Sequence, residues 1–245
     1  MLFPPASTEY VGKARKAYYE GDIETLKILI SFGVDASKLL QHDILSAPKY
    51  SQHVMDPKVL RVTLSSPLIA LNANYYRGTY PLVLAAIFLD KFEIWEALDG
   101  NAEINWNYTD KKGRNLAFWS ACCHSPNRFR FLRMCRLKKV EMDKKDHNGN
   151  RACSVAVHHD KLVAFKYLVD ECGADLNAQN DCGVTVIHEI CERSRVEMLK
   201  YAISKQCRFD IPNKNGETAL DFAKIYYSEE IADVLKAHDL WDKKK

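Results

Sequence analysis

The chain has 245 residues, of which 47% are hydrophobic, and a formal net charge of +3 at pH 7. This hydrophobic content is typical of a folded protein. No run of about 18 apolar residues occurs, which excludes a membrane-spanning helix, and Met1–Pro5 lacks the basic and apolar regions of a signal peptide.

Residues 11–35 are predicted to form the first helical unit, after an irregular lead-in over residues 1–10. Ala14 and Ala17 lie on its apolar side, and Gly33 marks its end. No turn precedes this unit, and its other side carries charged residues. These features are expected of the N-terminal capping unit of a stack.

The segment of residues 36–77 has two readings. The spacing from the end of the first unit to Gly78 exceeds the spacing between later units by 35 residues, which is close to the length of one further unit. The segment is therefore either a degenerate repeat or a long insertion. Because long structureless loops are uncommon in compact domains, the sequence favours a repeat with a helix over Asp56–Ser65.

The rest of the chain is punctuated by glycines at a regular spacing. Gly78, Gly113, Gly149, Gly183 and Gly216 are separated by 35, 36, 34 and 33 residues. The pattern after each glycine predicts a short helix and then a longer one, each with one apolar stripe. A single pair of such helices cannot bury its stripes alone, so neighbouring pairs must stack.

The stretch Asp170–Cys191 resembles the junction between two ankyrin repeats. Gly173 ends one helix, a polar turn ends at Gly183, and a new helix begins behind Thr185. The ankyrin period of about 33 residues also matches the glycine spacing.

The resemblance implies an all-α ankyrin-repeat solenoid with six recognisable helix-turn-helix repeats, and a degenerate seventh if the disputed segment is a repeat. It covers nearly the whole chain, so residues 1–245 are expected to form a single ankyrin-repeat domain. The expected parts are an N-terminal cap (11–35), a degenerate repeat or insertion (36–77), central repeats (78–212) and a C-terminal cap (213–240).

The unit that begins at Gly113 departs most from the family pattern. Asn115-Leu116-Ala117-Phe118 stands where the family has Thr-Pro-Leu-His, and Ser125-Pro126-Asn127 interrupts the unit between its helices. Its second helix is predicted to carry an apolar stripe of Phe129, Leu132 and Cys135. A unit that breaks the repeat rule is a candidate for a functional site.

No catalytic, cofactor or metal site is predicted. His188 follows Thr185 by three residues, and the resemblance implies that these two residues hold the stack together by hydrogen bonds. His158 and His159 point about 100° apart on one helix, so they do not readily share a metal ion. No glycine-rich phosphate loop or nucleophile motif occurs in the chain.

The eight cysteines contain no Cys-x-x-Cys pair, so neither a zinc site nor a disulfide framework is favoured. Cys153 and Cys191 fall in predicted first helices, where a free cysteine behaves as a small hydrophobic residue. Reduced thiols indicate the cytoplasm or the nucleus, or the host cytosol if the protein is a secreted effector.

Basic residues concentrate in one segment. Residues 111–151 contain twelve basic and three acidic residues, a net charge of +9, which leaves −6 for the rest of the chain. Such a segment can attract an acidic partner or a phosphate-bearing ligand. The alternative is a solvated surface, since residues 128–139 lie around a predicted second helix.

The resemblance implies a non-enzymatic protein-binding module that acts as an adaptor, an inhibitor or a pathogen effector. Its contact surface is expected to be concave and made of turn tips and first helices. The candidate contacts are Trp106, Tyr108, Lys111, Lys112, Arg114, Trp119, His147, Asn148, His158, His159 and Asp181. Trp106 and Tyr108, close to a turn tip, are expected to be difficult to bury.

The expected partner is a protein with an acidic surface, and the unbound chain is expected to be a monomer. Binding of a phosphorylated small molecule or a nucleic acid through residues 111–151 is the alternative function, and of these two ligands nucleic acid is the less expected. A steep loss of binding with added salt would favour the alternative.

Overall fold

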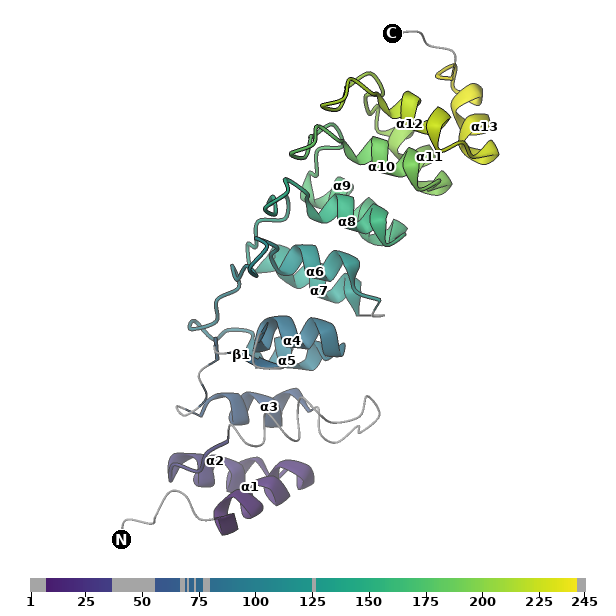
Figure 1. The fold of residues 1–245 in the computed structure, drawn as a ribbon. Coiled ribbons are helices and arrows are strands. Elements are labelled where there is room, and N and C mark those ends of the chain that lie inside the picture. The colour runs from purple at the N-terminus through teal and green to yellow at the C-terminus, as the bar shows by residue number, and fades with distance from the viewer. Residues whose placement is uncertain are drawn as a thin grey trace. The chain divides into compact units, whose positions relative to one another are not determined.

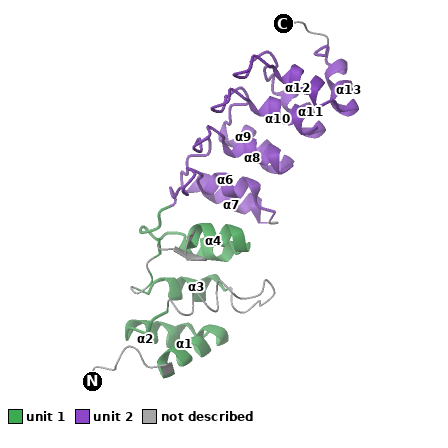
Figure 2. Ribbon diagram, in the orientation of Figure 1, with its two compact units in different colours: residues 1–105 green, residues 106–245 purple. Residues whose placement is uncertain are grey.

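The fold is described from a computed structural model of the chain (Figure 1). It describes residues 8–36, 56–66, 69, 71–72, 74–76, 80–124 and 127–241. The chain divides into two compact units, which we call unit 1 (residues 1–105) and unit 2 (residues 106–245) (Figure 2).

Unit 1 is built mainly of helices. They are α1 (Thr8–Glu20), α2 (Ile23–Ser31), α3 (Pro57–Leu64), α4 (Leu82–Leu89) and α5 (Phe92–Leu98). A short antiparallel hairpin, β1 (Asn74–Tyr76) with β2 (Tyr80–Pro81), precedes α4 and pairs Asn74 with Pro81 and Tyr76 with Tyr80. The sequence did not predict this hairpin.

The pair α1 and α2 forms as the sequence predicts. Ala14 and Ala17 are buried on α1. Asp22 begins α2, because its carboxylate accepts a hydrogen bond of 3.0 Å from the backbone N–H of Thr25, which satisfies one of the unpaired donors of the first turn.

The helix predicted over Asp56–Ser65 is present as α3, with the Asp56 carboxylate accepting from the N–H of Lys58 at 2.7 Å. Val59, Leu60 and Leu64 are buried, and α3 contacts both α2 and α5. The helix α3 therefore occupies the layer of second helices. Residues 37–55 lie outside the described part of the chain, so the choice between a repeat and an insertion stays a prediction.

The pair α4 and α5 forms the centre of unit 1. Every residue from Leu82 to Ile87 is buried, and Trp95 on α5 is wholly buried. The indole N–H of Trp95 donates to the carbonyl of Val83 at 2.7 Å, so the two helices are joined by a polar bond inside an apolar core. Gly78, the expected turn glycine of this unit, lies outside the described residues.

Unit 2 contains four pairs of helices. They are α6 (Leu116–Cys122) with α7 (Arg128–Leu137), α8 (Ala152–His158) with α9 (Leu162–Cys172), α10 (Val186–Glu192) with α11 (Val196–Ser204), and α12 (Ala219–Ile225) with α13 (Glu229–Ala237). The first helices α6, α8, α10 and α12 contact one another in sequence and form one layer, and the second helices form another. Across both units, six helix pairs and α3 are described, and the number of repeats stays a prediction.

The four turns that precede the first helices of unit 2 share one construction. Each has an Asp or Asn side chain whose oxygen accepts two hydrogen bonds, from the N–H groups two and four residues later. These side chains belong to Asp110, Asp146, Asn180 and Asn213, and their bonds measure 2.9–3.0 Å. The turn glycine of each tip follows three residues after this side chain and adopts positive φ, between 77° and 80°. We refer to these turns as the tips of unit 2 (110–114, 146–150, 180–184 and 213–217).

His188 has the structural role that the sequence predicts. It is wholly buried, and its Nδ1 accepts from the N–H of Thr185 at 3.1 Å, so its Nε2 carries the proton and donates to the carbonyl of Glu217 at 3.1 Å. Burial lowers the pKa of this histidine, against the opposing effect of the Glu217 carbonyl. A neutral His188 thus ties the α10 pair to the next tip.

Asn115 provides the corresponding tie in the divergent unit. Its side-chain oxygen accepts from the N–H of Phe118 at 3.0 Å, and its amide donates to the carbonyl of Glu141 at 2.7 Å. One asparagine therefore caps α6 and bonds to the segment between α7 and the next tip. This structural benefit weakens the argument that the departure at Gly113 by itself marks a functional site.

The predicted apolar stripe of α7 is partly wrong. Leu132 and Cys135 are wholly buried, but Phe129 is 44% exposed and Phe131 takes its place in the core. Two residues on a helix that are two positions apart lie on different faces, so Phe131 enters the core, whereas the partly exposed Phe129 packs edge-on against Tyr167 of α9, with ring centres 4.8 Å apart.

Candidate functional site

The candidate contacts of unit 2 gather mainly on one surface. We define the first-helix face as the four tips together with α6, α8, α10 and α12. Lys111 and Lys112 are exposed on the first tip, His147 and Asn148 on the second, and Asp181 on the third. Trp119 is half-buried on α6, and His158 and His159 are exposed at the end of α8.

Backbone hydrogen bonds join successive tips. The N–H of His147 donates to the carbonyl of Lys112 at 2.9 Å, and the N–H of Asp181 donates to that of Asn148 at 3.0 Å. The last of these bonds joins Lys214 to Cys182, also at 3.0 Å. These three bonds, which we call the tip ladder, fix the spacing of the tips without using any exposed side chain.

Arg114 is held in place at the first tip. Its guanidinium lies 2.7 Å from the Asp110 carboxylate and 4.1 Å from the centre of the Trp119 ring. Burial raises the pKa of Asp110, but the hydrogen bonds from Arg114 and from the N–H of Lys112 outweigh this effect and lower it overall. A stacked and paired arginine of this kind presents a rigid cationic and aromatic surface.

The expectation that Trp106 is exposed is wrong. Its side chain is only 9% exposed, and the ammonium of Lys138 lies 5.3 Å from its ring centre. Tyr108, which was grouped with it, is half-buried. Because a buried side chain cannot reach a partner without rearrangement, Trp106 contributes to packing rather than to an exposed contact.

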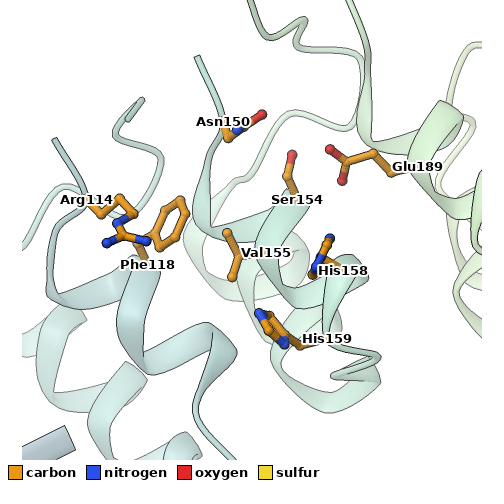
Figure 3. A pocket seen from close by; sticks show the side chains of 8 residues that line it. All are labelled: Arg114, Phe118, Asn150, Ser154, Val155, His158, His159 and Glu189. Carbon is orange, nitrogen blue, oxygen red and sulfur yellow. The ribbon is translucent and has the colours of Figure 1, made fainter. Parts of the chain in front are cut away.

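An open pocket of about 230 Å³ lies on the first-helix face (Figure 3). It is bounded by Arg114 and Phe118 on one side and by Glu189 on the other. Val155 lies between these two sides (Figure 3). The remaining lining residues are Asn150, Ser154, His158 and His159. The pocket therefore joins two tips, α6, α8 and α10.

The histidines beside this pocket stack on one another. The ring centres of His158 and His159 are 4.9 Å apart, and those of His124 and His159 are 6.0 Å apart, with near-perpendicular planes. Burial lowers the pKa of His158 and of His159, and nearby cations add to the effect. Both imidazoles are therefore neutral at pH 7.

Glu189 is the unusual ionisable group of this face. Its Oε2 atom is buried and has no hydrogen-bond partner within the described part of the chain. Burial raises the pKa of Glu189 to about 8; Arg193 opposes the shift and Glu192 adds to it. No sequence pattern indicated this residue, because a single glutamate on a short helix has no distinguishing pattern.

Exposed apolar side chains follow at the end of α12. Ile225, Tyr226 and Tyr227 are 59%, 47% and 63% exposed. They were not among the candidate contacts, although a pair of tyrosines directly after a predicted helix is a signal that could have found them. Tyrosine is a frequent anchor of protein interfaces, so the first-helix face has an aromatic end as well as a basic one.

The twelve basic residues of residues 111–151 do not share one surface. Those of α7 belong to the second-helix layer, whereas Lys111 and Lys112 belong to a tip. At least four of them are paired with carboxylates within the described part of the chain: Arg114 with Asp110, Arg136 with Glu171, Lys144 with Glu141 and Arg151 with Asp143. This division and pairing argue against one anion-binding surface, although binding of a phosphate-bearing ligand stays untested.

The cysteines Cys153 and Cys191 are buried, as predicted, and all eight cysteines are free. Among the described residues, no group of three or more His, Cys, Asp or Glu side chains could hold a metal ion. The described helices also include none that is long and apolar enough to cross a membrane.

Comparisons with known proteins agree with this arrangement. A family model described as "Ankyrin repeats (3 copies)" matches residues 152–244. The chain is also 34% identical over 62 residues to "Ankyrin repeat domain-containing protein 37" from Homo sapiens. The aligned region covers 25% of this chain and 39% of that relative, so the comparison concerns a part of each protein.

Proposed function

Because this chain is an ankyrin-repeat protein, we propose that it is a non-enzymatic module that binds a partner protein through the first-helix face of unit 2. Ankyrin repeats are in general protein-binding modules, and their stacked units create extended binding surfaces. The tip ladder is the observation that supports the choice of the first-helix face as the binding surface. It holds successive tips at a fixed spacing while leaving their side chains exposed.

A surface that is fixed before binding has a thermodynamic advantage. Association costs free energy for every side chain and loop that must become ordered. The tips of unit 2 are ordered by their own Asp or Asn side chains and by the tip ladder. A partner that contacts several tips therefore meets a surface that needs little reordering.

The chemistry of the face suggests where the affinity arises. Trp119, half-buried and stacked on Arg114 at 4.1 Å, has the properties of a central anchor, since tryptophan and arginine dominate interface energetics. Lys111 and Lys112 are exposed at the neighbouring tip. They fit an acidic surface on the partner and would mainly increase the rate of association.

This mode of binding is shared by adaptors, inhibitors and pathogen effectors, and we propose no choice among these roles. An affinity purification with the intact chain from its native cell, followed by mass spectrometry, would name the partner. The binding face is then tested with purified partner. We expect Trp119→Ala to weaken binding by about 2 kcal/mol, the cost typical of truncating an anchor.

The control variant is Lys200→Glu, which changes an exposed charge on the second helix α11 and should leave the affinity unchanged. Far-UV circular dichroism would confirm that both variants keep their helices. If Trp119→Ala binds as the native chain does, whereas Tyr226→Ala with Tyr227→Ala abolishes binding, the contact surface lies at the end of α12 instead. If Lys200→Glu alone abolishes binding, the second-helix layer is the contact surface.

A further inference from the structure

The pocket of the first-helix face has the size of a single side chain. Its volume of about 230 Å³ is below the roughly 300–1,000 Å³ of pockets that enclose drug-sized ligands. Val155 and Phe118 supply apolar surface, and Glu189 lies across from them with its carboxyl directed toward Ser154 (Figure 3). An elongated side chain with an apolar stem and a polar end matches this arrangement.

The polar end of the pocket has a carboxyl oxygen that receives no hydrogen bond from the part of the chain that is described. The buried Oε2 atom of Glu189 has no partner among the described residues. A buried carboxyl oxygen without a partner is unfavourable, and a donor that arrives with a ligand removes that penalty. An ammonium or guanidinium group is the strongest such donor, because its bond to a carboxylate is charge-assisted.

The arginines near the pocket oppose a further positive charge only weakly, because each has an acidic neighbour. Arg114 lies 2.7 Å from Asp110, and Arg195 lies 3.4 Å from Asp160. Arg193 directly follows Glu192 at the end of α10. The histidines of the lining are neutral at pH 7, and Glu189 supplies the carboxyl group of the pocket lining.

We propose that this pocket receives one lysine or arginine side chain of the partner protein, with its aliphatic stem along Val155 and Phe118 and its charged end at Glu189. The inference rests on the proposed function and adds a specificity to it. The partner then combines an acidic region, which faces Lys111 and Lys112, with one basic side chain that enters the pocket.

The titratable groups around Glu189 define how this contact depends on pH. They are Glu192 and Arg193 at the end of α10, Cys153 on α8, His158 and His159 at the end of α8, and Arg114 at the first tip. Burial raises the pKa of Glu189 to about 8, so the carboxyl is mostly protonated at pH 7 and an arriving cation displaces the proton. Affinity for a basic side chain should therefore rise as the pH increases toward about 8.

The test is a selection from a random peptide phage library on the intact chain, run in parallel on Glu189→Gln and on Glu192→Gln. The second variant removes the same charge from the same helix without altering the pocket lining. We expect peptides selected on the native chain and on Glu192→Gln to share a lysine or arginine at one position. Replacing that residue by norleucine or citrulline should weaken binding by roughly 10- to 100-fold, and Glu189→Gln should cause a similar loss.

Calorimetry with a selected peptide at pH 7 gives an independent readout. Binding should release a proton, visible as a different heat in two buffers of unequal ionisation enthalpy, and Glu189→Gln should abolish this difference.

Failure of the inference alone can be distinguished from failure of the proposed function. Peptides that bind the first-helix face without a shared basic residue, or whose basic residue is insensitive to Glu189→Gln, would overturn the inference and leave the proposed function intact. Selected peptides that lose no affinity with Trp119→Ala and Glu189→Gln together would overturn both.

Discussion

Replacing Gly183 by alanine tests whether the tip ladder stabilises unit 2. Gly183 has a φ of +78°, and an added Cβ atom would lie 2.8 Å from the backbone nitrogen of Lys214 and 3.0 Å from two backbone carbons of Asn213. That nitrogen donates to the carbonyl of Cys182 in the tip ladder. The neighbouring tip must therefore move, and the Cys182–Lys214 bond is lost or stretched.

The expected loss of stability has two contributions, one from the left-handed backbone and one from the contact between tips. Gly216→Ala measures the first contribution alone. Gly216 has nearly the same φ, +80°, but an added Cβ atom meets nothing within 4 Å, because the described residues place no further tip against it. A left-handed alanine costs about 1–2 kcal/mol, of which about 0.4–1 kcal/mol is offset by the lower entropy of the unfolded chain. Gly183→Ala adds overpacking of about 1–3 kcal/mol and a lost hydrogen bond of about 1 kcal/mol.

We therefore expect Gly216→Ala to destabilise unit 2 by about 1 kcal/mol and Gly183→Ala by about 3–5 kcal/mol. Urea unfolding followed by far-UV circular dichroism measures both on the full chain. Equal losses for the two variants would refute the reasoning, because the left-handed backbone would then account for the whole effect and the contact between tips for none.

Three further predictions concern the stack. His188 is neutral in the folded state because burial lowers its pKa. Its contribution to stability should therefore be complete above about pH 6.5 and should decline below that pH. In urea unfolding at about pH 7.5 and 5.5, His188→Gln should show a smaller decline than the native chain. Ala156 is wholly buried, so Ala156→Arg should cost at least about 3 kcal/mol, and an unchanged melting temperature would place this residue outside the core. Gln206 has a φ of +56°, so Gln206→Gly should raise stability by up to about 1 kcal/mol, whereas Ser204→Gly, at the last residue of α11, should lower it by about 0.5 kcal/mol.

The sequence was most informative where the backbone itself requires a particular residue. Gly149 and Gly183 adopt positive φ and lie against the next tip, so the spacing of the glycines predicted the four tips of unit 2 and the helix pairs between them. The equally regular Asp146 and Asn180, three residues before each glycine, were not used to predict the tips. Their regular position carries a physical requirement, since each orders its own tip by two hydrogen bonds.

The candidate site was less predictable because exposure depends on contacts between elements. Trp106 appeared difficult to bury from its place near a tip, yet it is 9% exposed. Glu189 lies among apolar residues of α10 and gains its raised pKa only from its surroundings in the fold. Periodicity shows which face of a helix is apolar, but it does not show which side chain a neighbouring helix will cover or leave without a partner.

The divergent unit shows the same limit. Asn115 and Phe118 were interpreted as departures from the family pattern, because the sequence shows which residue types differ but not which hydrogen bonds they form. In the structure Asn115 bonds to the carbonyl of Glu141, before the tip 146–150, whereas His188 bonds to the carbonyl of Glu217 within a tip. The two residues differ in type and in the position they bond to, but each joins the start of a first helix to a backbone carbonyl farther along the chain.

The tip ladder holds the stacked tips together without depending on the side chains that the tips expose. Its bonds join peptide groups, so the side chains of Lys112, His147, Asn148 and Asp181 can be exchanged without removing any of them. The exposed side chains of the tips can thus vary on an unchanged backbone, while the ordering side chains and the glycines stay in place. If the proposed binding face is correct, a few exposed positions can be changed to alter specificity without weakening the stack.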